Sequence, residues 1–387
     1  MLGVAAISAQ PVIYIAIGLF AIFALVLTLP FKVKLIERNL EPFFLVMGVI
    51  AVTISGLWSL SLVEEALKAP VIIGDTPIGI FQVVLVAGLA IFYFNKQFYR
   101  GVNALSEKLG PQLFIFVLVT LLGLLSSVIS VIVASVILAE IVAACTYERR
   151  QKINLTIIAC FAVGLGAVLT PLGEPLSTIA IYKLAGPPYF AGFFFLIQLV
   201  GSYVVVGVLG LAVLGAVWVG RNVAKGNKGK REPASCNPNG NASKDKMVTQ
   251  EQTAYTETLR NVLLRAVKVY IFVAALILLG EGLSPLIIWY FTQVPGPGLY
   301  WVNIISAVVD NATLTAAEVG PALTLIQIKS ALLGLLISGG MLIPGNIPNI
   351  VAAGRLKITS KEWARVGVIM GLIIMVIYFI ALLPSYL

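Results

Sequence analysis

Long runs of apolar residues alternate with short polar segments along almost the whole chain. Eight of these runs are long enough to cross a bilayer as helices. They cover residues 11–30, 42–62, 78–95, 153–182, 189–219, 262–290, 328–354 and 363–384. Because backbone in lipid must satisfy its own hydrogen bonds, runs of this kind form helices. The pattern predicts an all-α polytopic membrane protein.

Two further apolar stretches, 111–147 and 298–327, are interrupted by small polar residues. The second would form a helix of about 44 Å at ~1.5 Å per residue. Two complete crossings need about 60 Å. We therefore expect a re-entrant helical hairpin with Asp310 near its tip. The first stretch is longer, and it fits either a hairpin or two short spans.

The segment 221–260 differs from the rest, because it is rich in Lys, Gly, Pro, Ser and Asn. This composition predicts a flexible, soluble linker. The linker separates a first transport repeat, 78–220, from a second transport repeat, 261–387. Residues 1–77 have no counterpart in the other half, and we interpret them as N-terminal scaffold helices.

Short sequence similarities support the division into repeats. Ser126-Ser-Val-Ile-Ser130 precedes Ser306-Ala-Val-Val-Asp310 by 180 residues, and Leu169-Thr-Pro-Leu-Gly-Glu-Pro-Leu176 is similar to Leu342-Ile-Pro-Gly-Asn-Ile-Pro-Asn349. Each half is predicted to contain a span, a hairpin, a broken span and a span. The first unit starts outside and the second inside, so the repeats are inverted. Inverted repeats are typical of transporters, with the binding site near the membrane midplane.

Composition and charge agree with this interpretation. Hydrophobic residues make up 59% of the chain and charged residues 11%, whereas soluble domains carry about 25% charged residues; the mean hydropathy is +1.02. The net charge is +9, yet 23 of the 26 Lys and Arg lie in alternate loops and in the linker, which argues against nucleic-acid binding. Positive residues stay cytoplasmic. We therefore expect a multi-pass protein of the cell (inner) membrane, with a cytoplasmic linker and both termini outside.

The segment from Thr170 to Thr178 is the first predicted break within a span. Its Pro and Gly residues interrupt the helix and release backbone carbonyls. Glu174, Ser177 and Thr178 add hard oxygen ligands of the kind that suit Na⁺. The alternative is a structural kink with a snorkelling glutamate. The matching break in the second half offers the amides of Asn346 and Asn349, with a purely structural kink as its alternative.

The second hairpin places an acid in apolar sequence, which costs ~3 kcal/mol or more unless the acid has a partner or a role. Asp310 is followed by Asn311 and Thr313, so an oxygen-rich ion site is expected at this tip. The alternative is that Asp310 caps the following helix. Ser130 is expected at the tip of the first hairpin.

Three acids are candidate proton carriers: Asp310, Glu174 and Glu140. The first two are also the candidate ligands for Na⁺. Glu140 has an equally open alternative, a place at the cytoplasmic end near Arg149.

The motifs resemble those of the ion transporter superfamily, and most of all those of NhaD-type Na⁺/H⁺ antiporters. Ser306-Ala-Val-Val-Asp310-Asn311 is similar to their second-half motif, and Thr170 to Thr178 is similar to their first break. The resemblance implies cation binding at Glu174 and Asp310, and a homodimer with the first spans as scaffold. The family tends to carry Asp-Asn at the first hairpin, where this chain has Ser130-Val131. One carboxylate is therefore missing, which also fits a less characterised branch of predicted cation transporters.

The leading hypothesis is a secondary antiporter that exchanges Na⁺ or Li⁺ for H⁺ by alternating access, without a cofactor. The alternative is Na⁺-coupled symport of a dicarboxylate-like anion. A passive channel is a third hypothesis. The expected partners are small inorganic ions and the bilayer. An enzyme is not expected, because a Ser-His protease needs histidine, which the chain lacks, and a two-Asp protease needs a second membrane Asp beside Asp310.

Overall fold

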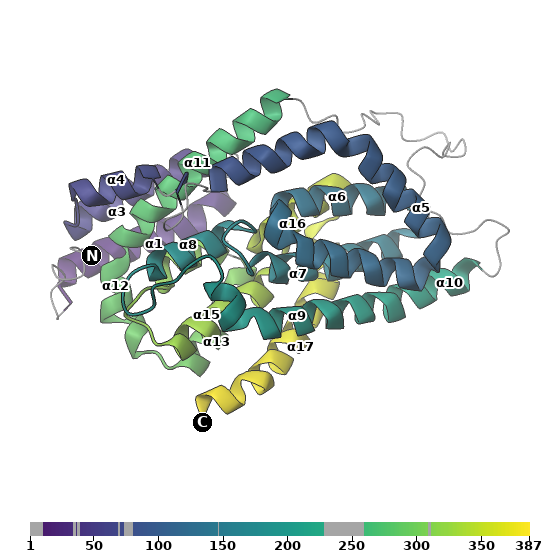
Figure 1. The fold of residues 1–387 in the computed structure, drawn as a ribbon. Helices are drawn as coiled ribbons and strands as arrows, with labels where there is room; N and C mark the ends of the chain where they lie inside the picture. Colours follow the sequence, from purple (N-terminus) through teal and green to yellow (C-terminus); the bar gives the residue numbers. More distant parts are fainter. Residues whose placement is uncertain are drawn as a thin grey trace.

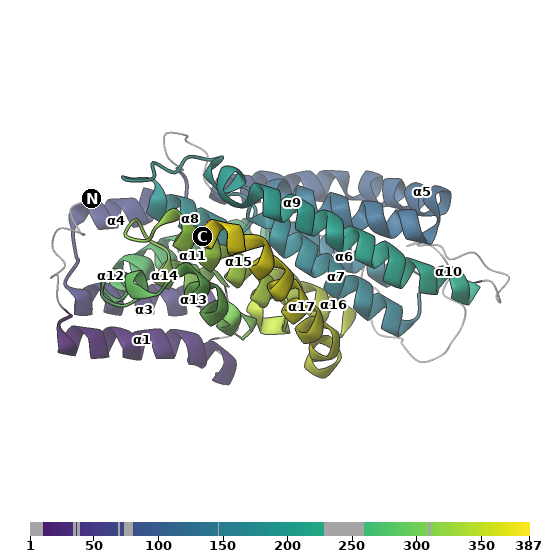
Figure 2. The same cartoon turned by 90° about the horizontal axis from the view of Figure 1, so that it is seen from below.

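Helices form nearly all the regular structure in the computed structural model, which describes residues 11–33, 36, 39–68, 70–72, 80–145, 147–227, 259–308 and 311–387. They pack into an elongated bundle, with α1 and α3 at one end and α10 at the other (Figures 1 and 2). Asp310 and most of the predicted linker lie outside the described residues, so their expected positions stay predictions.

The first half and the N-terminal region contain α1 (Ile13–Lys32), α3 (Leu40–Ser55), α4 (Leu60–Lys68), α5 (Ile80–Ile129), α6 (Val131–Ala144), α7 (Arg149–Ala167), α8 (Pro175–Leu184), α9 (Phe195–Gly215), the π-helical turn η2 (Ala216–Gly220) and α10 (Arg221–Asn227). The second half contains α11 (Leu259–Gly282), α12 (Ser284–Trp289), η3 (Phe291–Gln293), α13 (Gly296–Val302), η4 (Asn303–Ala307), α14 (Asn311–Glu318), α15 (Leu325–Gly339), η5 (Ile343–Gly345), α16 (Ile347–Leu356) and α17 (Ser360–Tyr386).

Two predicted spans are interrupted where Pro and Gly are concentrated. α7 ends at Ala167 and α8 begins at Pro175. α15 ends at Gly339 and α16 begins at Ile347, with only the short turn η5 between them. Pro lacks the amide hydrogen that a helix interior needs and clashes with the preceding turn. The helix breaks expected in 153–182 and 328–354 are confirmed.

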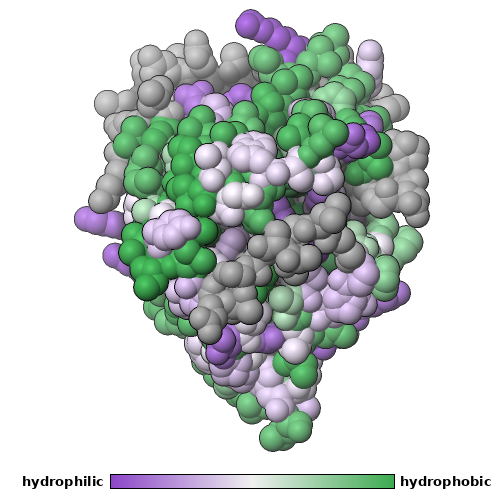
Figure 3. Space-filling view, turned by 90° about the vertical axis from the view of Figure 1, so that its left-hand side faces the viewer, coloured by the Kyte–Doolittle hydropathy of each residue, from purple (hydrophilic) through white to green (hydrophobic). Residues whose placement is uncertain are grey.

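Within the described ranges, three helices are long and apolar enough to cross a membrane: Leu109–Ile129, Phe195–Ala224 and Ser360–Tyr386. A fourth candidate is α11 with α12, whose axes differ by 43°. Hydrophobic residues are also exposed over much of the face in Figure 3. Together these features indicate a helical membrane protein. By length and composition the described residues hold fewer complete spans than the eight expected, partly because the breaks leave α7, α8, α15 and α16 short.

The stretch 111–147 contains one long and one short helix. α5 is kinked at Gly110, which has φ 67° and is followed by Pro111. Glycine adopts this φ without the clash that a Cβ would cause. The second part of α5 then meets α6 at Ser130. α6 has 14 residues, or about 21 Å, less than the ~30 Å of a hydrocarbon core. Two full-length straight spans therefore do not fit this stretch.

α7 lies at the centre of the bundle, and its residues from Ile153 to Ala167 are all buried. It packs against α5, α6 and α9 of its own half and against α15, α16 and α17 of the other half. The approach to α5 is close, because a Cβ built on Gly166 would lie 1.6 Å from the carbonyl oxygen of Gly123. α7 thus brings the two halves together beside both helix breaks.

Candidate functional site

Glu174 is the N-cap of α8 and is buried, with 1% of its surface exposed. It is the last residue of the non-helical segment 168–174. The hydroxyl of Ser177 donates to the carbonyl oxygen of Glu174 at 2.7 Å, and that of Thr178 donates to the carbonyl oxygen of Pro171. Both predicted ligands therefore also hold the break in shape. Their oxygens keep lone pairs that can accept a further bond or bind a cation.

Asn346 occupies the same place in the second half. It is the N-cap of α16 with φ −153° and ψ 149°, and Glu174 has φ −152° and ψ 161°. Its Oδ1 accepts from the amide of Ile347 at 2.8 Å. Asn349 donates through Nδ2 to the carbonyls of Gly339 and Leu342, both at 2.8 Å. The two breaks thus end in the same backbone conformation.

The turn before α6 contacts the first break. The amide of Val131 donates to the carbonyl of Gly173 at 2.7 Å. Ser130 lies beside this bond, is 5% exposed and has φ 71°. A non-glycine residue in this region of φ is strained, and such strain is frequent at functional sites. The N-termini of α6 and α8 are therefore neighbours.

The segment before α14 contacts the second break in a comparable way. A Cβ built on Gly345 would lie 2.5 Å from the carbonyl oxygen of Ser306 and 2.8 Å from that of Ala307. Asn311, the first residue of α14, is 2% exposed. Asp310 precedes it and lies outside the described residues, and the side chain of Thr313 is not described either. The proximity of Glu174 to Asp310 therefore stays a prediction.

Helices of the first half pack against helices of the second half. α6 packs against α16, and α8 packs against α14. Lys183 of α8 donates to the carbonyl of Ala316 in α14 at 2.6 Å, and Arg355 of α16 donates to Glu140 of α6 at 2.5 Å. Lys183 is nine positions after Glu174, and Arg355 is nine positions after Asn346. Each contact joins the C-terminal parts of its helix pair, so the helices of a pair run in the same direction.

The N-termini of four helices consequently gather around the two breaks: those of α6, α8, α14 and α16. Three buried polar atoms in this region have no hydrogen-bond partner among the described residues: Oγ of Ser306, Nδ2 of Asn311 and Oδ1 of Asn349. Glu174, the N-cap of α8, is the described acid at these four N-termini. Groups of three or more His, Cys, Asp or Glu side chains suited to a metal do not occur in the described part of the chain. A cation here would bind mainly to neutral oxygens.

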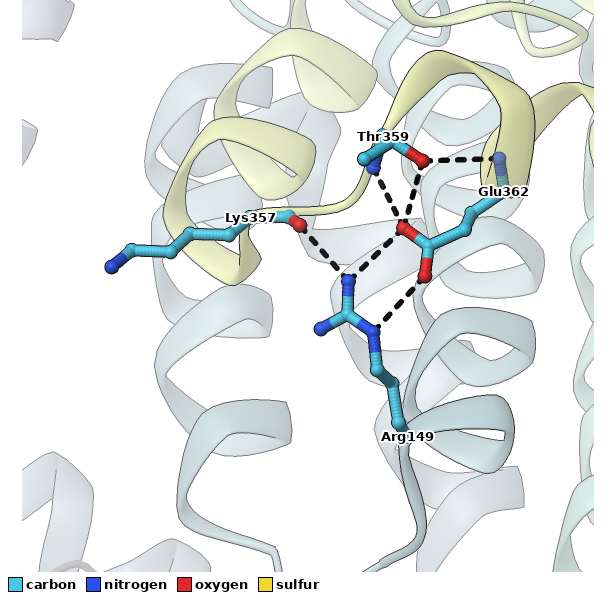
Figure 4. Close-up of polar contacts among 4 residues, drawn as sticks. All are labelled: Arg149, Lys357, Thr359 and Glu362. Carbon is cyan, nitrogen blue, oxygen red and sulfur yellow. Dashed lines mark hydrogen bonds and ion pairs between the residues drawn. The ribbon is translucent and has the colours of Figure 1, made fainter. Parts of the chain in front are cut away.

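Two charged residues of the first half pair with residues of the second half. Glu140, for which a proton-carrier role and a place near Arg149 were both open, pairs with Arg355. Arg149 instead makes two hydrogen bonds of 3.0 Å to the Glu362 carboxylate and one to the carbonyl of Lys357 (Figure 4). The reason is that the beginning of α17 packs beside α7 and brings Glu362 to Arg149.

Lys183 of α8 makes contacts that its position in the sequence does not predict. Besides its bond to Ala316, its ammonium lies 3.4 Å from the carbonyl of Gly280 in α11. Both acceptors lie near helix C-termini, where a cation is stabilised by the helix dipole. Lys183 therefore joins α8 to two helices of the second half.

Sequence reasoning missed the environment of Glu318 and Asn303. Glu318 is the last residue of α14 and is 2% exposed. It lies beside the side chain of Asn303, which is fully buried. Its position two turns after Asp310 on one helix face was the available signal.

The chain belongs to a family of proteins of unknown function (DUF1646), whose sequence model matches residues 16–384. None of the curated proteins matches the chain. The match covers both halves and both breaks, so the features described above belong to one family unit.

Proposed function

We propose that this protein is a secondary active transporter that exchanges Na⁺ or Li⁺ for H⁺. The observation that carries the proposal is Glu174, a buried carboxyl at the N-cap that follows a helix break. An intramembrane acid of this kind marks an ion or proton pathway. Burial favours the protonated form and a bound cation favours the ionised form. Proton and Na⁺ then compete for the same oxygens, and this competition couples their transport.

Alternating access is supported by the arrangement of the two halves. The order α5, α6, α7, break, α8, α9 corresponds to the order α11 to α14, α15, break, α16, α17. The reciprocal contacts α6–α16 and α8–α14 support inverted repeats that each contain a hairpin and a broken helix. In transporters with such repeats, one repeat moves against the other around a central site.

The proposed cation ligands are the carboxylates of Glu174 and Asp310, the Asn349 side-chain oxygen and carbonyls of the breaks. Ser130 and Thr178 supply hydroxyl oxygens nearby. The proposed topology keeps the linker in the cytoplasm and both termini outside, and the proposed assembly is a homodimer. No enzymatic step and no cofactor is part of this mechanism.

Na⁺-coupled symport of an anion is the second candidate, and one observation favours it. Four helix N-termini gather at the breaks, and each carries a partial positive charge. Helix N-termini of this kind bind anionic groups in other transporters. The Nδ2 donor of Asn311, which is buried without a described partner, would add to such a site.

Transport by purified protein in liposomes tests these alternatives. With a pH-sensitive dye inside, external Na⁺ should drive proton movement through the wild type. Glu174→Gln and Asp310→Asn should abolish this movement, because an amide cannot release a proton. Glu64→Gln is the matched control, since Glu64 is exposed and, among the described residues, its ion pair is with Lys68.

Three outcomes would contradict antiport. The first is wild-type exchange by either site variant. The second is Na⁺-driven uptake of labelled succinate without proton counter-movement, which would support the symporter. The third is Na⁺ flux that needs no counter-ion exchange, which would indicate a channel.

A further inference from the structure

An apolar groove of about 1110 Å³ runs along the outside of the bundle between α7, α9 and α17. Its walls include large apolar side chains that are exposed to the surroundings, among them Val206, Leu214, Ile369 and Ile373. α9 and α17 belong to two of the helices that are long and apolar enough to span a membrane. The groove therefore faces the region that lipid chains occupy.

Glycine opens the groove on the α9 side. Gly210 lines it, and a Cβ built there would meet no atom within 4 Å. The described residues therefore leave the space over Gly210 unfilled. Gly207 also lines the groove, but a Cβ there would collide with the hydroxyl of Tyr378. Tyr378 thus closes the groove at its far end.

The length of the groove corresponds to one leaflet. Along α17 its lining runs from Glu362 to Tyr378, and the part between Arg365 and Tyr378 is about 20 Å long at ~1.5 Å per residue. Half of a ~30 Å hydrocarbon core is about 15 Å. A single acyl chain that enters at the level of Arg365 would therefore reach the bilayer midplane at the other end.

The entrance to the groove is basic. Arg149, Arg150, Arg365 and Glu362 line it. Arg149 is neutralised by its ion pair with Glu362 (Figure 4). Arg150 and Arg365 are exposed, and neither makes an ion pair or hydrogen bond to another described residue. Two guanidinium groups consequently remain for an anion at the headgroup level.

We propose that this groove binds an anionic phospholipid, with one acyl chain along α9 and α17 and the phosphate at Arg150 and Arg365. Guanidinium groups bind phosphate through paired, charge-assisted hydrogen bonds. Basic pockets between membrane helices are established sites for anionic headgroups. This lipid is a resident ligand, and its binding does not depend on which ions the protein transports.

Charge distinguishes this occupant from a second copy of the chain. In a two-fold dimer the same patch meets itself. Arg150 and Arg365 of one copy would then face Arg150 and Arg365 of the other copy. No acid among the described residues pairs with them, so the two copies would repel each other there. An anionic lipid removes this repulsion, whereas a second copy creates it.

Native mass spectrometry of detergent-purified protein tests the proposal. The probe is an equimolar mixture of phosphatidylglycerol and phosphatidylcholine with identical acyl chains. The wild type should retain phosphatidylglycerol preferentially, and the preference should fall about five-fold for each arginine replaced in Arg150→Gln and Arg365→Gln. Gly210→Phe should reduce retention of both lipids, because the ring fills the acyl position. Arg221→Gln and Gly192→Phe, which lie outside the groove, should match the wild type.

A headgroup competitor separates lipid from simple phosphate binding. Glycerol 3-phosphate carries the phosphate without chains and should not displace the lipid. Displacement by it would overturn the acyl-chain assignment. Equal retention of both lipids by the wild type, or an unchanged preference in the double arginine variant, would overturn the headgroup assignment. A dimer that Gly210→Phe dissociates would show that the groove is an interface between copies.

Discussion

Replacing Arg355 by glutamine should loosen the contact between α6 and α16. The wild-type guanidinium binds the carboxylate of Glu140, whose side chain is 17% exposed, while that of Arg355 is 39% exposed. The pair is thus neither fully exposed nor fully buried. Glutamine keeps a polar side chain at this position but removes the charge.

The magnitude follows from this intermediate burial. Exposed ion pairs contribute ~0.2–1 kcal/mol, and breaking a buried pair costs ~3–5 kcal/mol. We expect ~1.5 kcal/mol for this pair. Since ~1.4 kcal/mol is a factor of ten in an equilibrium constant, the population of molecules with α6 and α16 apart should rise about ten-fold.

Cys160 of α7, which also packs against α16, reports the movement of α16. It is 1% exposed, and its thiol lies 3.5 Å from the carbonyl of Pro348 in α16. A membrane-permeant maleimide reaches the thiol only when α16 moves away from α7. The alkylation rate, followed by mass spectrometry of the Cys160 peptide, should increase about ten-fold in Arg355→Gln. Arg365→Gln is the control, since it removes an exposed arginine from another helix.

Two results would refute this reasoning. One is an alkylation rate of Arg355→Gln that equals the wild-type rate. The other is an equal increase in Lys183→Gln, which weakens the α8–α14 contact instead and should leave Cys160 protected. A thermal unfolding curve for each variant separates local opening from general loss of stability.

Three further predictions concern stability and topology. Gly166→Ala should lower the free energy of unfolding by ~3 kcal/mol, because its Cβ would overlap the carbonyl of Gly123, whereas Gly210→Ala should be neutral or slightly stabilising in thermal melts. Burial, and secondly the carboxylate of Glu281, raise the pKa of Glu65 from its usual value of 4.5. The folded state therefore loses stability as the pH rises above about 4.5, because the unfolded chain ionises Glu65 more easily. Glu65→Gln should raise the melting temperature at about pH 7 but not at about pH 4. An impermeant maleimide applied outside intact cells should not label Cys236, and ready labelling would overturn the predicted cytoplasmic linker.

The positions of the helix breaks could be predicted from the sequence because their cause is local. Pro171 and Gly173 lie two residues apart, and Pro344 and Gly345 are adjacent. A proline inside an apolar run removes a helix hydrogen bond and clashes with the preceding turn, so such a cluster favours a break. Both breaks end in an extended N-cap residue, Glu174 and Asn346; their relation as repeats stays a prediction.

The partners of charged residues could not be predicted, because they depend on contacts between distant segments. Glu140 and Arg355 are 215 residues apart in sequence. Only the packing of α6 against α16 brings them together, and no local pattern encodes that packing. The same applies to Lys183, whose acceptors are backbone carbonyls in α11 and α14. A carbonyl acceptor leaves no trace in a sequence pattern.

The charge at the breaks constrains how the proposed antiporter works. Four helix N-termini each contribute about half a positive charge, or roughly two charges in total. Ionised Glu174 and Asp310 would balance these charges, so Na⁺ would enter a nearly neutral, oxygen-lined site and bind weakly enough to be released. Protonation of one acid would leave about one excess positive charge, which repels Na⁺.

A chain with a third carboxylate at Ser130 would bind the cation more tightly, so we expect Ser130→Asp to slow Na⁺ release and lower the maximal exchange rate in liposomes. A faster exchange rate in Ser130→Asp would contradict this charge balance.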